Sequence, residues 1–531
     1  MKRFHCACLL SLLFFVSTLQ AQNCQSNQNP RIDVRAQGWG FDVKNSRFLP
    51  NNVAGLAPDN IKKLKLKWAF VFDNQSKVRS QPAISGDTVY IGSANGTVYA
   101  LDRGTGCVRW TFENTWEVRT ALVLTADLAD RAMVFFGDFR GTVFALDANN
   151  GQLIWKHKVD EHIGTTLTGT PSLYQGVLYV PISSFEVALA AAPMYPCCTF
   201  QGAVAALDAK TGKPLWKTPI MEAATERGSN AMFVTRYGPS GAPIWNSPTI
   251  DAQRGLLYVG SGENYSQPTT DSSDAVIAMD LKSGAIKWKR QLIPNDAWNM
   301  ACAVPLIGTN CPENPGKDLD VGASPILATT ADGQDLLLVG QKSADVWGLN
   351  PDSGQVIWHK KLGKGGALGG VHWGMAYDGD KLYVPISDYM LTIPGLNPVD
   401  PDNKAPEQPS LTALNIKTGD IIWRKELSPI CAKVEDCPPG LSAAITAIPG
   451  AVFAGALDGH LRAYNSQTGE QLWDVDTTPE VTGTSGSTGH GGSIDASGPV
   501  VVDGEVYVNS GYGFFGEKAG NVLLVYSIDG K

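Results

Sequence analysis

Charged residues are scarce in this sequence, and the basic ones are not in excess. Lys, Arg, Asp and Glu make up 18% of the 531 residues, and the formal net charge is -8 at pH 7. Proteins that bind the phosphate backbone of nucleic acids depend on clustered Lys and Arg for much of their affinity. This charge balance argues against a nucleic-acid partner.

Long apolar segments are also missing after the N-terminus. No later segment offers the roughly 20 uninterrupted apolar residues that a membrane-spanning helix needs. The N-terminus has basic residues, then a short apolar run at 9–16 and a small-residue cleavage pattern at 19–21, which is typical of a secretory signal peptide. We therefore expect residues 1–21 to be a signal peptide, residues 22–531 to form the mature domain, and the protein to be exported without a membrane span.

The haem-attachment motif Cys-x-x-Cys-His is absent from the sequence, which argues against a covalently bound c-type haem. Eight cysteines remain after the signal peptide, and an even number in an exported chain favours disulfides. Local spacing suggests three pairs and leaves a fourth by elimination: Cys302–Cys311, Cys431–Cys437, Cys197–Cys198 and Cys24–Cys107.

Glycine and tryptophan, by contrast, are abundant, with 56 and 14 residues. Both recur in a pattern that consists of an apolar strand, a turn of the form Asp/Asn-x-x-Thr/Ser-Gly, and a second strand that ends in Trp. The turn glycine can adopt a positive φ at little steric cost. Seven complete copies are present, at residues 99–110, 144–155, 205–216, 277–288, 347–358, 412–423 and 462–473.

The spacing of the copies indicates the fold. Successive tryptophans are between 45 residues (Trp110 to Trp155) and 72 residues (Trp216 to Trp288) apart, which matches four-stranded propeller blades with variable loops. An eighth copy, residues 522–530, stops before its tryptophan, and Trp68 can supply that residue. We predict an all-β, eight-bladed β-propeller with tryptophan-docking repeats, closed by pairing of its N- and C-terminal strands.

The chain resembles the quinoprotein alcohol dehydrogenases over essentially its whole mature length, beginning with residues 40–48 and 60–68 and continuing to the C-terminus. Members of this family carry pyrroloquinoline quinone (PQQ) and calcium on the axis of an eight-bladed propeller. The tryptophan repeats are shared with non-catalytic propellers, and a scaffold or sensor of the bacterial envelope is the alternative. The resemblance implies a periplasmic enzyme.

Two segments resemble the family's calcium-binding strands. Residues 178–186 end in Glu186, and residues 257–264 end in Asn264, so the resemblance implies that these two residues bind calcium. A hard cation prefers such oxygen ligands. Asn299 stands where related enzymes carry their proposed catalytic aspartate, and it can bind calcium but cannot act as a base. Asp296 or Asp320 is left as the base, with a slight preference for Asp296.

Further residues match cofactor-binding positions of the family. Trp245 matches the tryptophan on which the planar quinone stacks, and Lys342 matches the cation that stabilises negative charge on the quinone during catalysis. The remaining candidates for PQQ contacts are Arg119, Thr168, Ser183, His372 and Trp373.

The adjacent cysteines Cys197 and Cys198 follow the Glu186 strand, and we expect their disulfide to form a wall of the cofactor pocket. With the segments 295–299 and 310–325, they resemble the polyvinyl alcohol dehydrogenase branch of the family. That resemblance implies oxidation of secondary alcohols, including those of a polymer, to ketones. It also implies transfer of the electrons to a separate cytochrome c.

Overall fold

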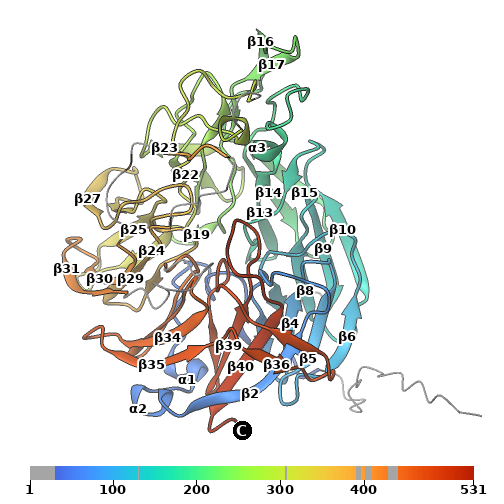
Figure 1. Ribbon diagram of the computed structural model, residues 1–531, viewed down its shortest axis with the longest axis vertical. Coiled ribbons are helices and arrows are strands. Elements are labelled where there is room, and N and C mark those ends of the chain that lie inside the picture. The colour runs from blue at the N-terminus through green and yellow to red at the C-terminus, as the bar shows by residue number, and fades with distance from the viewer. Residues whose placement is uncertain are drawn as a thin grey trace, which may run out of the picture.

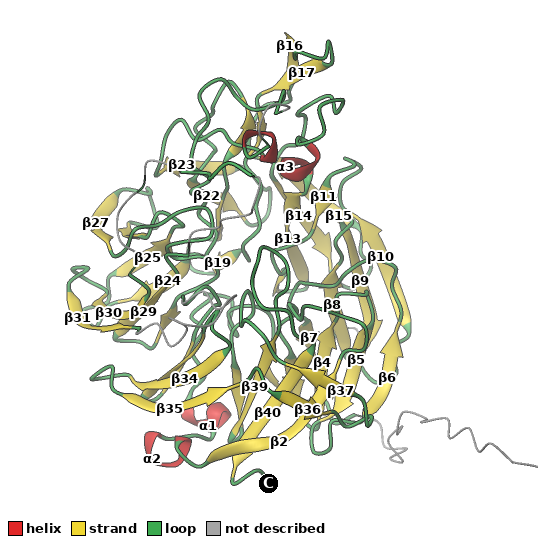
Figure 2. Ribbon diagram, in the orientation of Figure 1, coloured by secondary structure: helices red, strands yellow, loops and turns green. Residues whose placement is uncertain are grey.

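The structure is a computed structural model that describes residues 30–128, 131–304, 308–389, 396–400, 403, 408–427 and 440–531. Antiparallel sheets make up nearly all of its regular structure and are arranged in a ring, as Figures 1 and 2 show. Eight of these sheets are four- or five-stranded blades. The predicted all-β, eight-bladed propeller is therefore confirmed.

The blades follow one another in chain order. Blade 1 contains β1 (Val34–Ala36), β3 (Ala83–Ser85), β4 (Thr88–Gly92), β5 (Val98–Asp102) and β6 (Val108–Phe112), and blade 2 contains β7 (Val123–Thr125), β8 (Met133–Gly137), β9 (Thr142–Asp147) and β10 (Leu153–Lys158). Blade 3 contains β11 (Thr165–Thr166), β12 (Ser172–Tyr174), β13 (Val177–Ser184), β14 (Ala203–Asp208) and β15 (Pro214–Pro219). Blade 4 contains β19 (Thr249–Asp251), β20 (Leu256–Gly260), β22 (Ala275–Asp280) and β23 (Ile286–Gln291). Blade 5 contains β24 (Ile326–Thr329), β25 (Asp335–Gly340), β26 (Asp345–Leu349) and β27 (Val356–Lys361), and blade 6 contains β28 (Ala376–Tyr377), β29 (Lys381–Ile386), β30 (Ser410–Asn415) and β31 (Ile421–Glu426). Blade 7 contains β32 (Thr446–Ile448), β33 (Ala451–Gly455), β34 (His460–Asn465) and β35 (Gln471–Asp476). Blade 8 contains β38 (Val500–Val502), β39 (Glu505–Ser510), β40 (Val522–Ile528) and β2 (Leu64–Val71).

Blade 8 joins the two ends of the described chain. Strand β2 pairs with β40 from Leu64 opposite Ile528 to Val71 opposite Val522, and Figure 1 shows the blue and red strands side by side. An unpaired strand edge is thereby covered within the ring. The closure predicted from the incomplete eighth repeat, with Trp68 as its tryptophan, is confirmed.

Seven of the eight blades are tied to the next blade by a hydrogen bond from their repeat tryptophan. The indole Nε1–H of Trp68 in blade 8 donates to the backbone oxygen of Arg103 in blade 1, at 3.0 Å. Six other repeat tryptophans donate in the same way to a backbone oxygen of the following blade: Trp110, Trp155, Trp216, Trp288, Trp358 and Trp423. These indoles therefore act as docking groups between blades.

The turn glycine of the repeat is the surface against which the tryptophan packs. Gly106 has φ +71°, and a Cβ there would lie 2.7 Å from the ring of Trp68. Gly354 in blade 5 has φ +67° and an equally close approach to Trp288 of blade 4. Both the backbone conformation and the contact require glycine. The two hallmarks of the repeat thus meet across seven of the eight blade boundaries.

The apolar core is divided into layers between neighbouring blades. One such layer combines Tyr258 and Val276 of blade 4 with Leu337 and Val339 of blade 5, and all four are fully buried. Since strand residues alternate between the two faces of a sheet, each blade contributes one face to each of two layers. The centre of the ring is therefore free for polar side chains.

The remaining elements are short. They are the helices α1 (Asn51–Ala54), α2 (Pro58–Ile61) and α3 (Glu186–Leu189), the 3-10 helix η1 (Met300–Cys302), and the paired strands β16 (Thr225–Ser229) with β17 (Thr235–Gly238), β18 (Ser240–Gly241) with β21 (Asn264–Ser266), and β36 (Glu480–Thr482) with β37 (Thr488–His490). The hairpin β16–β17 projects from one side of the ring in Figure 1.

Two predicted disulfides are present, Cys197–Cys198 and Cys302–Cys311. Cys107 is also disulfide-bonded, whereas its expected partner Cys24 and the pair Cys431–Cys437 lie outside the described residues, as does the predicted signal peptide.

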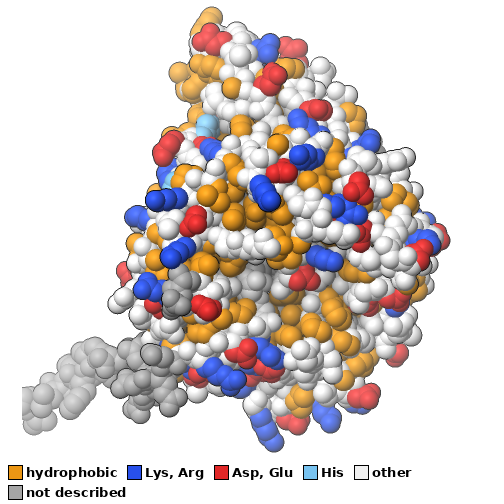
Figure 3. Space-filling view, turned by 180° about the vertical axis from the view of Figure 1, so that it is seen from behind, with side chains coloured by type: hydrophobic (Ala, Val, Ile, Leu, Met, Phe, Trp, Pro, Cys, Tyr) orange, Lys and Arg blue, Asp and Glu red, His pale blue; other side chains and the backbone are white. Residues whose placement is uncertain are grey.

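Within the described part of the chain, no helix has the length and apolar character needed to cross a membrane. Basic and acidic side chains are interspersed on the face shown in Figure 3.

Replacing Trp68 by Ala should lower the free energy of unfolding by about 3–5 kcal/mol, because it removes a buried indole from the blade that closes the ring. Chemical denaturation followed by circular dichroism measures this loss. Leu66→Ala in the same strand is the control, since Leu66 is 42% exposed and should lose much less. Equal losses in both variants would contradict the docking role of Trp68.

Candidate active site

A cavity of about 290 Å³ gathers side chains from blades around the ring. Arg119 precedes blade 2, Trp245 precedes blade 4, and Lys342 lies between β25 and β26 of blade 5. Since blades that face one another across a propeller meet only near its axis, the cavity is axial. Eight of the predicted site residues line it: Arg119, Thr168, Ser183, Trp245, Asp320, Lys342, His372 and Trp373.

Trp245 is held rigidly in the cavity wall. Its Nε1–H donates to Oδ2 of Asp320 at 2.9 Å, and its ring meets the ring of Trp373 edge to face, with centroids 5.0 Å apart. A Cβ at Gly322 would lie 2.0 Å from the Trp245 ring, so that position has room only for glycine. The ring is therefore a fixed aromatic surface, suited to a flat ligand.

Beside this ring lies a buried cluster of charged groups. Carboxylate oxygens of Glu263, Asp318 and Asp320 lie within 4.8 Å of one another. The Nζ atom of Lys342 is 2.7 Å from Oδ1 of Asp318 and 3.0 Å from Oδ2 of Asp320. It also lies 5.4 Å from the centroid of Trp245. One ammonium group thus faces three carboxyl groups.

The environment divides these carboxyl groups into two kinds. Burial would raise the pKa of Asp320, but the charge of Lys342 and hydrogen bonds from Glu263 and Lys342 outweigh burial and lower it. Burial and the neighbouring negative charges raise the pKa of Glu263 and that of Asp318 well above their usual range. Asp320 is therefore the ionised carboxylate, while Glu263 and Asp318 hold protons when no cation is present.

A further carboxyl group near the cluster has no hydrogen-bond partner. Both carboxylate oxygens of Asp274 are buried without a partner among the described residues. Burial raises the pKa of Asp274 well above its usual range, and the charges of Asp296, Asp320 and Asp318 add to that effect. Buried oxygen atoms in such number, with Lys342 among them, are suited to a hard divalent cation.

Arg119 supplies positive charge to another part of the cavity wall. It forms no ion pair with any described residue, and its nearest polar partner is the hydroxyl of Tyr512, at 3.5 Å. The guanidinium lies 5.1 Å from the ring centroid of Trp373. Burial and the charge of Arg79 lower the pKa of Arg119. A ligand carboxylate would give this guanidinium the two-pronged partner it lacks.

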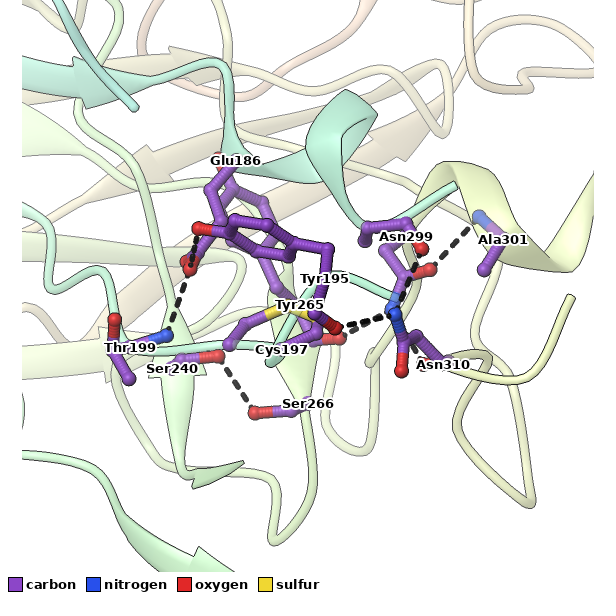
Figure 4. The surroundings of a disulfide bond; sticks show 12 residues. Glu186, Tyr195, Cys197, Thr199, Ser240, Tyr265, Ser266, Asn299, Ala301 and Asn310 are labelled. Atoms are coloured by element: carbon purple, nitrogen blue, oxygen red, sulfur yellow. Dashed lines mark hydrogen bonds between the residues drawn. A yellow bond between two sulfur atoms is a disulfide. The ribbon is translucent and has the colours of Figure 1, made fainter. Parts of the chain in front are cut away.

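Glu186, which the resemblance implied as a calcium ligand, is buried away from the cavity. Its carboxylate accepts hydrogen bonds from the hydroxyl of Tyr195 and from the N–H of Thr199, both at 2.9 Å (Figure 4). It also accepts one from the N–H of Phe200 at 2.8 Å. These bonds tie α3 to the segment that follows Cys198. The structure thus gives Glu186 a role in shaping this loop.

Asn264 is also engaged with protein groups. Its Oδ1 accepts from the N–H of Thr270 at 2.8 Å, and its Nδ2 donates to the backbone oxygen of Ser240 at 3.1 Å. The preceding residue, Glu263, points into the cavity instead. Side chains of neighbouring residues in an extended segment point to opposite sides. The calcium ligand implied by the resemblance, Asn264, is therefore one residue away from the residue that faces the cavity.

Asn299 does not line the cavity either. Its Oδ1 accepts from the N–H of Ala301 and caps η1, and its Nδ2 donates to the backbone oxygens of Tyr265 and Asn310 (Figure 4). In this structure Glu186, Asn264 and Asn299 each form hydrogen bonds with neighbouring protein groups.

The two candidate bases have different surroundings. Asp296 accepts hydrogen bonds from the backbone N–H groups of Lys317, Asp318 and Leu319, at 3.0 to 3.3 Å, and does not line the cavity. It fixes the segment that presents Asp320. Asp320 lines the cavity, where it contacts both Trp245 and Lys342. The contacts therefore favour Asp320, against the slight preference drawn from the sequence.

The Cys197–Cys198 disulfide lies in the apolar core of blade 3, against Phe200 and Tyr265. Tyr265 lines the cavity, whereas neither cysteine does. The pair therefore supports the wall from behind and does not form its surface.

Four acidic residues of the site, Glu263, Asp274, Asp318 and Asp495, were not among the candidates predicted from the sequence; Asp495 lines the cavity together with Glu263 and Asp318. Asp318 and Asp320 have a spacing of two, which places side chains on the same side of an extended segment and was a usable signal. Asp274 lies in a loop whose path follows no regular period, so its approach to the cluster could not be anticipated.

Comparison with known proteins gives two family matches. The model described as "Glucose/ethanol/alcohol dehydrogenase, beta-propeller domain" matches residues 37–314, and the model described as "Outer membrane protein assembly factor BamB" matches residues 342–531. Polyvinylalcohol dehydrogenase from a Pseudomonas species is 38% identical over 523 residues, which cover 94% of this chain and 79% of that protein. Its counterpart from Sphingopyxis sp. (strain 113P3) is 38% identical over 536 residues, with coverage of 97% and 80%.

Among solved structures, the quinohemoprotein alcohol dehydrogenase ADHIIG from Pseudomonas putida HK5 is similar in fold. Its TM-score is 0.69 at 18% identity, and the match covers 94% of this chain and 80% of that one.

Glu186→Gln should lower the free energy of unfolding by about 1–3 kcal/mol, because the amide keeps one acceptor oxygen and leaves a buried backbone N–H without its partner. Thermal unfolding of the protein without added metal measures the effect. Glu161→Gln is the control, since the side chain of Glu161 is 87% exposed and the change should be small. An unchanged stability in Glu186→Gln would show that the loop does not depend on this carboxylate.

Proposed function

This chain belongs to the PQQ-dependent alcohol dehydrogenases, in the polyvinyl alcohol dehydrogenase branch, and from this we propose that it oxidises secondary alcohols, including hydroxyl groups of polyvinyl alcohol, to ketones. We also propose that calcium accompanies PQQ, that the enzyme works in the periplasm, and that a cytochrome c takes up the electrons. The observation that carries the catalytic part is the position of Asp320, an ionised carboxylate bonded to both Trp245 and Lys342.

The cavity fits PQQ in size and in chemistry. PQQ is a flat quinone with three carboxylates. The rigid indole of Trp245 suits the flat ring, and the guanidinium of Arg119, which forms no ion pair with the residues that the structure describes, suits a carboxylate. Thr168 and Ser183 offer hydroxyl groups to the same space, and Trp373 and His372 complete the wall. PQQ, when bound, supplies the two-electron acceptor for alcohol oxidation.

The residues fit a calcium ion at a different place from the one implied by the sequence resemblance. We assign the ion to Glu263, Asp318 and Asp320, because their oxygens already converge and Lys342 offsets only one of the negative charges. The carboxyl group of Asp274, which has no hydrogen-bond partner among the described residues, places two further oxygen atoms near this position. A divalent cation would relieve the repulsion that keeps Glu263 and Asp318 protonated.

Asp320 is placed to take the proton of the alcohol hydroxyl. Its low pKa keeps it ionised, and the Trp245 and Lys342 contacts fix its carboxylate in one orientation. Removal of this proton would prepare the alcohol for oxidation to the ketone, for which bound PQQ would supply the two-electron acceptor. Lys342 stabilises the negative charge that develops beside it.

The entrance to the cavity is suited to a carbon chain. Phe139, Phe185, Met300, Phe514 and Phe515 line it, and Phe185 and Phe514 are 39% and 41% exposed. Aromatic and thioether side chains bind alkyl segments without demanding a fixed direction of approach. This supports a polymeric or bulky secondary alcohol as the substrate.

Asp320→Asn should lower kcat by about 100- to 10,000-fold, because it removes the general base and retains the shape of the side chain. Asp296→Asn is the matched comparison and should retain turnover better, since Asp296 acts only on the backbone of the neighbouring segment. The apoproteins are loaded with PQQ and calcium, and dye reduction by polyvinyl alcohol and by small secondary alcohols is followed. Bound PQQ is measured by its absorbance in each variant.

An inactive wild-type protein, with no PQQ bound and no alcohol oxidised, would refute the proposed function. An Asp296→Asn variant that retains PQQ and is the more severely impaired of the two would transfer the role of base to Asp296.

Glu263→Gln should weaken calcium binding by about tenfold or more, because it removes a charged ligand from the cluster. Titration calorimetry of calcium into the apoprotein measures the affinity. Glu186→Gln is the control, and its affinity should match that of the wild type, since its carboxylate is engaged by Tyr195, Thr199 and Phe200. The reverse outcome would restore the ligand assignment implied by the sequence.

A further inference from the structure

Three loops at equivalent positions of successive blades bring a histidine, a serine and an aspartate into contact. His372 precedes β28 of blade 6, Ser442 precedes β32 of blade 7, and Asp495 precedes β38 of blade 8. Nδ1 of His372 lies 2.8 Å from Oγ of Ser442, and Oγ of Ser442 lies 2.6 Å from Oδ1 of Asp495. All three side chains are buried.

Both ends of this chain of hydrogen bonds reach the cavity. His372 and Asp495 line the cavity, and Ser442 lies between them. The ring of His372 is 5.8 Å from that of Trp245 and meets it edge to face. Asp495 therefore communicates with the surroundings of Trp245 through a hydroxyl group and an imidazole.

The donors and acceptors fix the tautomer of His372. Ser442 has a single hydroxyl hydrogen, and an ionised Asp495 can only accept it. Oγ of Ser442 must then accept from Nδ1–H of His372, which leaves Nε2 of the neutral ring without a proton. Burial, with a further effect from the charge of Lys342, lowers the pKa of His372 well below its usual value and keeps the ring neutral.

We propose that His372, Ser442 and Asp495 form a reversible proton relay, which takes a proton at Nε2 of His372 and stores it on the carboxyl group of Asp495. The proposal rests on the proposed alcohol oxidation as the source of that proton. As Nε2 gains a proton, Nδ1 gives its own to Oγ of Ser442, and Ser442 gives its hydrogen to Oδ1 of Asp495. These shifts together carry one proton, in net terms, from the cavity to Asp495, and no electron is exchanged. The reverse shifts return the proton to the cavity once the electrons have left.

The surroundings of Asp495 suit it for temporary storage. Burial raises the pKa of Asp495 to about 6, whereas hydrogen bonds from Ser442 and Ala496 and the charges of Arg119 and Arg79 oppose the rise. A carboxyl group with this pKa accepts and releases a proton near neutral pH.

Two further titratable groups face Asp495. Burial raises the pKa of Glu517 to about 7, and the negative charge of Asp495 contributes. Burial also raises the pKa of Tyr512, which stays protonated. On the histidine side, Lys342, Asp320 and Arg119 are the charged groups that act on the ring. None of these groups lies between His372 and Asp495 along the hydrogen bonds.

The backbone holds the three loops in register. The N–H of Trp373 donates to the oxygen of Ser442 at 3.3 Å, and the N–H of Ala444 donates to the oxygen of Ala496 at 3.1 Å. The relay is therefore built on fixed loops, and a proton shift needs no movement beyond the turn of one hydroxyl.

The first test uses the apoprotein and needs no cofactor. At pH 7.5, nitrogen NMR of histidine-labelled protein should show neutral His372 protonated at Nδ1, and lowering the pH through about 6 should shift it to the Nε2–H form as Asp495 takes up a proton. Ser442→Ala should abolish this pH-linked shift, and Ser442→Thr, which keeps the hydroxyl, should restore it. His460, which is bonded to Asp474 on the outer strands, is the internal control and should be unaffected by these changes.

A pH-linked tautomer shift of His372 that persists in Ser442→Ala, or an Nε2–H form in the wild type at pH 7.5, would overturn the relay. This result is independent of whether any alcohol is oxidised.

The second test uses the holoenzyme. Because storage needs an ionised Asp495, kcat should fall as the pH drops through about 6, and Asp495→Asn should lose that limb of the pH profile. Ser442→Ala should lower kcat by about 10- to 100-fold with little change in KM, whereas Ser442→Thr should stay near the wild type. Wild-type kcat and pH profile in Ser442→Ala would overturn the relay, while a wild-type protein without activity would refute the proposed function and leave the NMR result standing.

Discussion

The docking of one blade's tryptophan onto the next blade's turn glycine is the contact on which this structure depends. It joins two residues of the same repeat, but from neighbouring copies, as Trp68 and Gly106 or Trp288 and Gly354 illustrate. The hydrogen bond from the indole to a backbone oxygen fixes the height of each blade, and the close approach to glycine fixes its distance. Because the contact lies toward the outside of the ring, the inner loops are free to carry chemistry.

The inner loops carry far more buried negative charge than a stable core tolerates unaided. Glu263, Asp274, Asp318 and Asp320 crowd around Lys342, and the protein resolves the conflict by ionising Asp320 and protonating its neighbours. Such an arrangement costs stability, and a ring of rigid blades can bear that cost. A second buried charge lies elsewhere in the cavity wall, where the guanidinium of Arg119 has no ion pair among the described residues, and its burial costs stability for the same reason.

The ring could be predicted well from the sequence because the number and spacing of the repeats determine the number of blades. Seven copies and a partial eighth specified the blade count, and the missing last tryptophan pointed to Trp68 and hence to the closure. The candidate site was predicted less completely. Trp245, Lys342 and Arg119, which match cofactor-binding positions of the family, line the cavity, whereas Asn264 was selected in place of its neighbour Glu263. A shift of one residue moves a side chain to the opposite side of the chain, and no pattern of residue types in that segment reveals the direction. Asp274 and Asp495 reach the site through loop paths that only the folded backbone defines.

The pairing of β2 with β40 also has a consequence for how the chain folds. Strand β2, the outer strand of blade 8, stays without its partner until β40 is available, so the ring closes only when these two distant segments meet. Seven blades can build up in sequence from local hairpins, but the final step must overcome the entropy of joining ends separated by more than 450 residues, from Val71 to Val522. The same arrangement means that new termini opened in an outer blade loop, with the present ends linked, would preserve every blade contact. In a circular permutant of that kind the pairing of β2 with β40 would become local, and the long-range closure would move to the blade that was opened.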